Sequence, residues 1–261
     1  MSRIVAVIAI ILLSGCASVD KEASWTQEEF YKAAKEQLKN ANYVAAIKLY
    51  DSLQARFPYG TYADQANLDA AYANFKIKEK AQVIAECDRF IQLHPTHPNV
   101  DYAYYLKGLS QEIDSDGLFD FIAQQDFTER DPASAQGAFN AFNELVTRFP
   151  NSIYAADARR RMEKQKQNLA GHELHVARYY LVRGAPVAAA NRAKSVLEKF
   201  PESPEREEAL AILVAAHDTL GQFQLRDDAK RVLALNYPDS LFLEGYKPQS
   251  KGAWWAIWTK L

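Results

Sequence analysis

The sequence is poor in the residues that build disulfide scaffolds, glycine-rich turns and polyanion-binding surfaces. It has two cysteines, ten glycines and ten prolines in 261 residues, and 31 lysines and arginines against 33 aspartates and glutamates. Two cysteines cannot form a disulfide framework, and so few glycines and prolines argue against a glycine-punctuated all-β chain. Without a basic excess, nucleic-acid binding is disfavoured, because clustered positive charge binds polyanions. The hydrophobic fraction of 48% is nevertheless enough for a buried core.

The longest apolar run is also too short for a transmembrane helix. Residues 4–13 are ten apolar residues that follow Arg3, about half of the ~20 that cross a bilayer and typical of a signal-peptide core. The run leads into Ser14-Gly15-Cys16, which resembles a bacterial lipobox. We therefore expect residues 1–15 to be a lipoprotein signal peptide and Cys16 to carry a diacylglycerol and an N-acyl chain. The alternative is an ordinary signal peptide with a chance cysteine.

The residues after the lipobox indicate how the chain is attached and sorted. Several acyl chains on one residue give stable membrane anchoring. Residues 16–24 are mostly small or polar and are expected to be a tether. By resemblance to sorted bacterial lipoproteins, Ala17 after the cysteine, rather than Asp, implies passage to the outer membrane, at its periplasmic face. No other cofactor is expected, and Cys87 is expected to be a small buried hydrophobe.

Five prolines divide the rest of the chain into similar units. Each follows an aromatic residue or a histidine, and the spacings are 37, 55, 51 and 37 residues. Proline cannot continue a helix and biases its predecessor away from helical geometry, so each one is expected to mark the end of a helix. A recurring interval of 37 residues indicates an internal repeat. The prolines are Pro58, Pro95, Pro150, Pro201 and Pro238.

Residues 12, 8 and 5 positions before each of the first four prolines share one helical face, because these offsets differ by four and three. We expect them to form the core. Small residues 24 positions before three of the prolines should let two helices approach closely. The expected core residues are Ala46, Tyr50, Leu53, Val83, Cys87, Phe90, Ala138, Phe142, Leu145, Ala189, Ala193 and Val196, and the small residues are Ala34, Ala71 and Ala177.

One insertion and one long helix account for the two wider intervals. An 18-residue excess around 113–131 brings Gly108 to the small-residue position of the third unit. The next interval exceeds 37 by 14 residues, close to four helical turns, and predicts one long helix over 154–180. The fifth unit fits only after a shift of one residue, which places in the core Leu213, Leu225, Ala229 and Val232.

The pattern resembles the tetratricopeptide repeat, a helix-turn-helix unit that ends in proline. This resemblance predicts an all-α fold, an α-solenoid of about five such repeats whose stacked units bury one continuous core and form a concave groove. Repeats 1–3 are expected in residues 25–150 and repeats 4–5 in residues 151–244, followed by a Trp-rich tail in 245–261. A globular helical bundle would not predict prolines in register.

No sequence motif predicts catalysis or metal binding. His172 and His175 are three residues apart, whereas a zincin helix needs a spacing of four. Residues 114–117 superficially match the start of a calcium loop but lack its remaining ligands. The sequence also has no Gly-rich phosphate loop and no Gly-x-Ser-x-Gly elbow. We therefore expect a binding protein with no catalytic residue and no metal.

The groove is the first candidate binding surface. In tetratricopeptide repeats the first helix of each unit lines it, at positions 27 and 23 before the proline. Tyrosines beside a lysine could receive an extended peptide that ends in an aromatic residue and a carboxylate. The alternative is that these tyrosines only pack between helices. The candidates are Tyr31, Lys35, Leu68, Tyr72, Tyr105 and Leu109.

Arg192 and the tail are candidate partner contacts. Arg192 lies off the core face of its predicted helix and is expected to point outward. Four residues of the tail recur at i, i+3, i+4 and i+7 and so form one apolar stripe. The stripe either caps the last repeat or lies at the membrane interface or in a partner's groove. It consists of Trp254, Ile257, Trp258 and Leu261.

The chain resembles the BamD/ComL family, the tetratricopeptide-repeat lipoproteins of the outer-membrane β-barrel assembly machinery. The resemblance is most specific in residues 94–102, 130–132, 149–152 and 179–192. It implies a non-catalytic scaffold whose later repeats bind the periplasmic (POTRA) domains of the barrel insertase, alongside other lipoproteins of the complex. Its early repeats would receive unfolded barrel proteins, whose last strand commonly ends in an aromatic residue. It assigns no role to the Trp-rich tail.

Two other functions are compatible with the same repeats. An envelope adaptor that coordinates peptidoglycan synthesis with cell division can be built from the same repeats, but usually lacks the Pro-Thr-His-Pro-Asn turn of residues 95–99. A lipoprotein that captures glycans would stack its aromatic side chains on sugars. Identification of the proteins that co-purify in mild detergent would separate these functions from barrel assembly.

Overall fold

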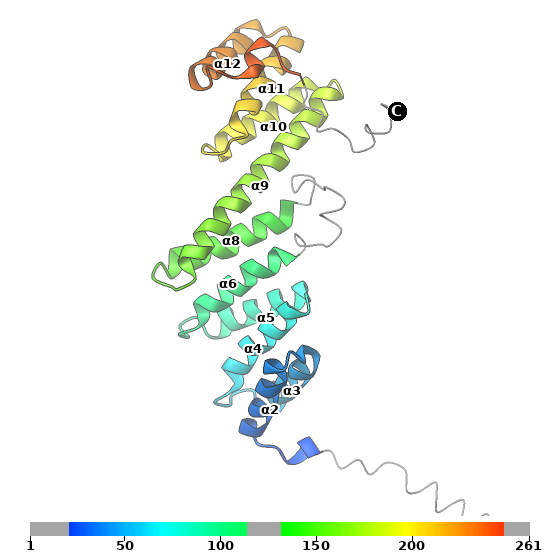
Figure 1. Cartoon of the computed structure of the whole chain (residues 1–261), viewed down its shortest axis with the longest axis vertical. Helices are drawn as coiled ribbons and strands as arrows, with labels where there is room; N and C mark the ends of the chain where they lie inside the picture. Colours follow the sequence, from blue (N-terminus) through cyan, green and yellow to red (C-terminus); the bar gives the residue numbers. More distant parts are fainter. Residues whose placement is uncertain (1–20, 114–131, 248–261) are drawn as a thin grey trace, which may run out of the picture. The chain divides into compact units, whose positions relative to one another are not determined.

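The computed structural model describes residues 21–113 and 132–247, which form helices joined by short connections (Figure 1). These two ranges contain ten α-helices, two 3-10 helices and no β-strand. The chain divides into two compact units between Phe90 and Ile91. The predicted all-α repeat fold is confirmed. None of the described helices is long and apolar enough to cross a membrane.

The first unit consists of consecutive helices joined by short connections. The short helix η1 spans Lys21–Ser24, and α2 spans Gln27–Lys39. The α2 helix starts with a capping box, in which the Thr26 hydroxyl accepts from the Glu29 N–H and the Glu29 carboxylate accepts from the Thr26 N–H. Helix α3 packs against both α2 and α4. The remaining helices are α3 (Tyr43–Arg56), α4 (Ala63–Lys76) and α5 (Lys80–Leu93), whose last turn crosses the division.

The second unit repeats this arrangement over six α-helices. Each helix packs on the next, and α9 also contacts α11. Helix α9 has 28 residues and confirms the predicted long helix. Because α6 packs directly on α8, the predicted insertion separates the two halves of one helix pair, and its residues 114–131 lie outside the described ranges. The helices are α6 (Val100–Gln111), α8 (Pro132–Arg148), α9 (Ala155–Val182), α10 (Pro186–Lys199), α11 (Arg206–Thr219), α12 (Phe223–Asn236) and the 3-10 helix η4 (Leu241–Glu244).

The predicted core of the first four units and the predicted helix ends are confirmed. All twelve residues at positions 12, 8 and 5 before the first four prolines are at most 1% exposed, and the three small alanines are fully buried. Gly108 on α6 also occupies its predicted small-residue position. A Cβ built there would lie 2.4 Å from Cε1 of Phe142, so α6 and α8 touch where only glycine fits.

The shift of one residue predicted for the fifth unit is wrong. Gly221 has a φ of 69° and lies 17 residues before Pro238, the same offset at which the other left-handed residues precede their prolines. Leu233 lies at the unshifted core position and is 1% exposed, whereas Leu225 is 50% exposed and Val232 is 40% exposed. The shifted residues Leu213 and Ala229 are only partly buried.

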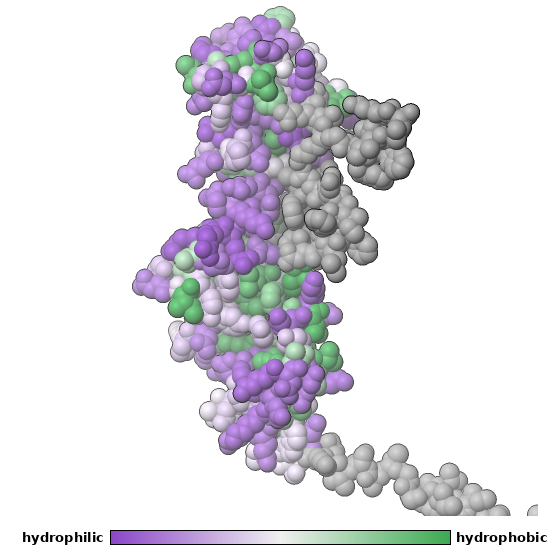
Figure 2. All heavy atoms as spheres, in the orientation of Figure 1, coloured by the Kyte–Doolittle hydropathy of each residue, from purple (hydrophilic) through white to green (hydrophobic). Residues whose placement is uncertain are grey.

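The position of α12 as the last described α-helix explains why the apolar pattern gave the wrong core residues for the fifth unit. Among the described helices, α12 packs only against α11 and η4, so its opposite face has no helix to cover it. Arg226 and Lys230 therefore replace the apolar residues found 12 and 8 positions before the other prolines. Terminal repeats of helical arrays commonly have such a polar outer face. Figure 2 shows hydrophobic side chains mixed with hydrophilic ones over this part of the chain.

Candidate binding surface

The predicted groove residues lie on the first helices of the repeats and form two groups, one in each unit. Tyr31 and Lys35 lie on α2, and Leu68 and Tyr72 on α4, all in the first unit. Tyr105 and Leu109 lie on α6 in the second unit. The domain boundaries predicted at residues 150 and 244 are not tested by this arrangement and stay predictions.

In the first unit, Tyr31 and Lys35 are held by a carboxylate of the next first helix. Asp69 on α4 is 7% exposed, and its Oδ2 lies 3.2 Å from the Tyr31 hydroxyl and 2.7 Å from the Lys35 ammonium. The buried Tyr50 hydroxyl of α3 donates to the same oxygen over 3.1 Å, and the Gln65 amide donates to Oδ1 over 3.0 Å. Asp69 therefore joins three helices through polar groups that would otherwise be available to a ligand.

The tyrosines of this cluster remain hydrogen-bond donors at neutral pH. Burial raises the pKa of Tyr31 and of Tyr50, and the negative charge of Asp69 raises both further. The Tyr31 ring also stacks on Tyr62, the residue that precedes α4, with ring centroids 4.9 Å apart. Tyr31 thus contacts the start of α4 through its ring and the middle of α4 through its hydroxyl.

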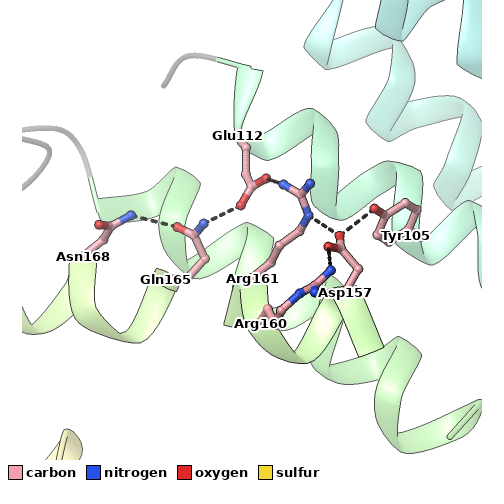
Figure 3. Close-up of polar contacts among 7 residues, drawn as sticks. All are labelled: Tyr105, Glu112, Asp157, Arg160, Arg161, Gln165 and Asn168. Atoms are coloured by element: carbon pink, nitrogen blue, oxygen red, sulfur yellow. Dashed lines mark hydrogen bonds and ion pairs between the residues drawn. The ribbon is translucent and has the colours of Figure 1, made fainter. Parts of the chain in front are cut away.

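The second unit has a corresponding cluster between α6 and α9. The Tyr105 hydroxyl donates to Asp157 over 2.7 Å, and the Tyr105 ring stacks on Tyr154, with centroids 4.8 Å apart. Arg160 and Arg161 also donate to Asp157, over 2.7 and 2.5 Å. Figure 3 shows that Arg161 lies between Asp157 and Glu112, to which it also donates.

The network continues along α9 from this point. Gln165 donates to Glu112 over 2.6 Å, and the Asn168 amide donates to Gln165 over 3.3 Å (Figure 3). Glu112 lies at the C-terminal end of α6, so these contacts fix the last turn of α6 against the middle of α9. This is the helix end at which the described part of the chain stops before residues 114–131.

The charge of Asp157 contributes to the stability of this cluster. Burial opposes its ionisation, but hydrogen bonds from Arg161, Tyr105 and Arg160 outweigh burial and hold its pKa well below the usual range. A carboxyl group with a lowered folded-state pKa stabilises the fold above its unfolded pKa of about 4, and this contribution is lost as the pH falls. The α6–α9 contact should therefore weaken only in acid.

The two clusters show that Tyr31 and Tyr105 pack between helices, as one of the two interpretations expects, whereas their binding of a peptide stays a prediction. In each unit the tyrosine stacks on a second tyrosine, which lies four residues after Pro58 or Pro150. Its hydroxyl donates to a carboxylate on the first helix of the next repeat, α4 or α9. Both tyrosines therefore pack between first helices. Sequence reasoning missed their partners, although the recurring tyrosine four residues after Phe-Pro was a signal that could have found two of them. The missed residues are Tyr62, Asp69, Tyr154 and Asp157.

The remaining groove candidates differ in how accessible they are. Leu68 is 1% exposed and so cannot line an open surface in this structure. Tyr72 and Leu109 are half-buried, and the Lys35 side chain is 36% exposed beside Asp69. Tyr72, Leu109 and Lys35 are therefore the candidates whose side chains a ligand could still reach.

The predicted partner contacts fall partly outside the described residues. Arg192 lies on α10, off the core face as predicted, and its exposed side chain pairs with Glu173 of α9 at 3.0 Å. Cys16, Trp254 and Trp258 lie outside the described ranges, so their roles stay predictions. In residues 21–113 and 132–247, no group of three or more His, Cys, Asp or Glu is arranged to hold a metal ion.

Comparison with known proteins gives consistent matches along the chain. A family model described as an outer membrane lipoprotein, YfiO, matches residues 23–232. A protein of Neisseria meningitidis serogroup A, named outer membrane protein assembly factor BamD, is 44% identical, and the alignment covers 99% of this chain and 100% of that protein.

More distant relatives carry the same name. The Xylella fastidiosa (strain Temecula1) protein is 38% identical, over 91% of this chain and 82% of its own length. The Vibrio cholerae serotype O1 protein is 33% identical, over 88% of this chain and 95% of its own length. On the family match and these near full-length relatives, the chain belongs to the YfiO family of outer membrane lipoproteins.

Proposed function

We propose that this chain is an outer-membrane protein assembly factor, a non-catalytic lipoprotein scaffold of the β-barrel assembly machinery. The observation that carries the proposal is the similarity to relatives named BamD, at 33–44% identity over nearly the whole chain. The all-helical repeat fold supports a scaffold, because the polar clusters described above connect helices to one another. Acyl chains on Cys16 would hold it at the periplasmic face of the outer membrane.

The later repeats would bind the periplasmic domains of the barrel insertase. In the second unit, α9, α10, α11 and α12 pack in succession and can present a fixed surface to a folded partner. Arg192 is exposed on this surface, and its pairing with Glu173 holds its guanidinium in place. Anchoring to the same membrane raises the local concentration of the scaffold near the insertase and near other lipoproteins of the complex.

The early repeats would receive unfolded barrel proteins. Tyr72 supplies a half-buried aromatic ring, and Lys35 supplies a partly exposed cation. A peptide that ends in an aromatic residue and a carboxylate could pack on the first and pair with the second. Because Lys35 already pairs with Asp69 at 2.7 Å, the peptide carboxylate would have to share this ammonium.

Co-purification in mild detergent tests the assignment most directly. The lipidated chain should carry the β-barrel insertase with it, and Arg192→Glu should reduce the amount recovered. Lys194→Glu is the matched control, because Lys194 is also an exposed cation of α10 that pairs with one glutamate. Recovery of peptidoglycan synthases or glycans in place of an insertase would contradict the proposal.

The substrate part of the proposal has a separate test. Titration with a peptide from the last strand of a barrel protein should show weaker binding for Tyr72→Ala than for the unaltered chain. Tyr59→Ala is the control, because Tyr59 belongs to the same unit and is fully exposed. Equal affinities of the Tyr72→Ala variant and the unaltered chain would contradict a peptide site at Tyr72.

A further inference from the structure

A polar cavity lies between the second helices of the first two repeats, on different helices from the groove candidates. Its volume is about 390 Å³, at the lower end of the range for small-ligand pockets. The lining residues all belong to the first unit. They are Asp51, Gln54 and Ala55 of α3, and Gln82, Ala85, Glu86 and Arg89 of α5.

Glu86 is the unusual member of this lining. It is 5% exposed, and its Oε1 accepts from the Asn74 amide and the Gln82 amide, each over 3.1 Å. Its other oxygen, Oε2, is buried and has no hydrogen-bond partner. A buried carboxylate oxygen without a donor destabilises a fold. A donor from outside the chain would satisfy it.

The single cation of the cavity does not supply that donor. The Arg89 guanidinium donates to Gln54 of α3 over 2.6 Å, which holds it across the cavity from its own helix. Asp51 contributes a second carboxylate to the lining. Two carboxylates therefore face one guanidinium, so the cavity has an excess of acceptors and of negative charge.

Gln54 is already engaged as an acceptor, because Asn67 of α4 also donates to it over 3.4 Å. The acceptors left in the lining are the carboxylates of Glu86 and Asp51. A ligand that donates several hydrogen bonds and carries a positive charge matches this combination. Ala55 and Ala85 are small and leave room for a methylene chain.

We propose that this cavity binds an arginine side chain presented by a partner polypeptide, with its guanidinium paired to Glu86 Oε2 and to Asp51. A guanidinium donates two parallel hydrogen bonds to a carboxylate and keeps further N–H groups for other acceptors. An ammonium is more strongly hydrated and has fewer donors. The site is independent of the proposed function, because it uses neither Tyr72 nor the surface around Arg192.

The test is a titration of the full chain in detergent with three acetylated and amidated tripeptides, Gly-Arg-Gly, Gly-Lys-Gly and Gly-citrulline-Gly. Binding is followed by the NMR signals of ¹³C-labelled glutamate. The arginine peptide should shift one glutamate signal and saturate. The lysine and citrulline peptides should bind at least about tenfold more weakly, which corresponds to ~1.4 kcal/mol.

Substitution of Glu86 completes the test. Glu86→Gln keeps the shape of the side chain but removes its charge, so it should weaken the arginine peptide about tenfold. The same variant should unfold at a higher temperature than the unaltered chain, because an unpaired buried charge is removed. Glu36→Gln, on the exposed surface of α2, should change neither property.

Several results would overturn the proposal. They are no saturable binding of the arginine peptide, equal binding of the citrulline or lysine peptide, and unchanged arginine binding by a folded Glu86→Gln chain. If Glu86→Gln did not fold, Asp51→Asn would replace it, and full retention of arginine binding by that variant would overturn the pairing.

Discussion

The two units join their first helices with the same tyrosine geometry but with different charges. In the first unit, Asp69 is almost fully buried and receives two tyrosine hydroxyls and one ammonium. In the second unit, Asp157 is more exposed and receives one tyrosine hydroxyl and two guanidiniums. The comparison shows that the stacked tyrosine and its hydroxyl are the shared element, whereas the counter-charges vary.

The carboxylate lies one helical turn earlier in the second unit than in the first. Asp69 lies 11 residues after Pro58 and accepts a hydrogen bond from Gln65, which lies seven residues after Pro58. In the second unit, Asp157 lies seven residues after Pro150 and accepts a hydrogen bond from Arg161, which lies 11 residues after Pro150. Either turn of the helix can therefore supply the carboxylate, because both face the tyrosine of the preceding first helix.

Removal of Asp69 and removal of Asp157, each in a separate variant, should lower the free energy of unfolding by unequal amounts. This is the largest difference that we expect between the two units. Asp69→Ala leaves the buried Tyr50 hydroxyl without an acceptor and Lys35 without its partner, a loss of about 3 kcal/mol in the free energy of unfolding. Asp157→Ala should lose only about 1 kcal/mol, because Arg161 keeps Glu112 and Arg160 is exposed. Urea unfolding of both variants measures the difference, and equal losses would contradict the comparison.

In the second unit a helical glycine, Gly108, lies against a buried ring, and this contact should be the next most sensitive feature. Gly108→Ala places a Cβ against the buried ring of Phe142 and should lower the free energy of unfolding by about 2 kcal/mol. Gly137→Ala in α8 is the matched control, since its Cβ would meet the flexible end of Gln111. The control should be neutral or stabilising by less than about 1 kcal/mol, and a destabilised control would refute the contact argument.

The turns within the helix pairs should give the smallest difference between the units. In the first unit the left-handed residues are Ala41 and Lys78, whereas in the second they are Gly184 and Gly221. Lys78→Gly should raise the free energy of unfolding by about 0.5 kcal/mol, because glycine adopts positive φ without strain. Gly184→Ala should lower it by about 1 kcal/mol through conformation alone, since its Cβ would meet open space. Thermal unfolding midpoints that move in the opposite directions would contradict this explanation.

The helix ends and the core could be predicted from sequence because both depend on local patterns. Proline positions mark where helices end, and apolar residues four and three apart mark the buried face. The polar clusters could not be predicted in this way, because Tyr31 and Asp69 are 38 residues apart and Tyr105 and Asp157 are 52 apart. The prediction for the fifth unit failed for a related reason, since no described helix covers the outer face of α12 and apolar side chains are not needed there.

Tyr105 holds α6 against α9 through Asp157. A double-mutant cycle with Tyr105→Phe and Asp157→Ala, measured by urea unfolding, tests it together with a titration of a barrel-derived peptide against Tyr105→Phe. We predict a coupling energy of about 1 kcal/mol between the two side chains and an unchanged peptide affinity. A coupling energy near zero, accompanied by loss of peptide binding, would contradict this role and show that Tyr105 binds a ligand.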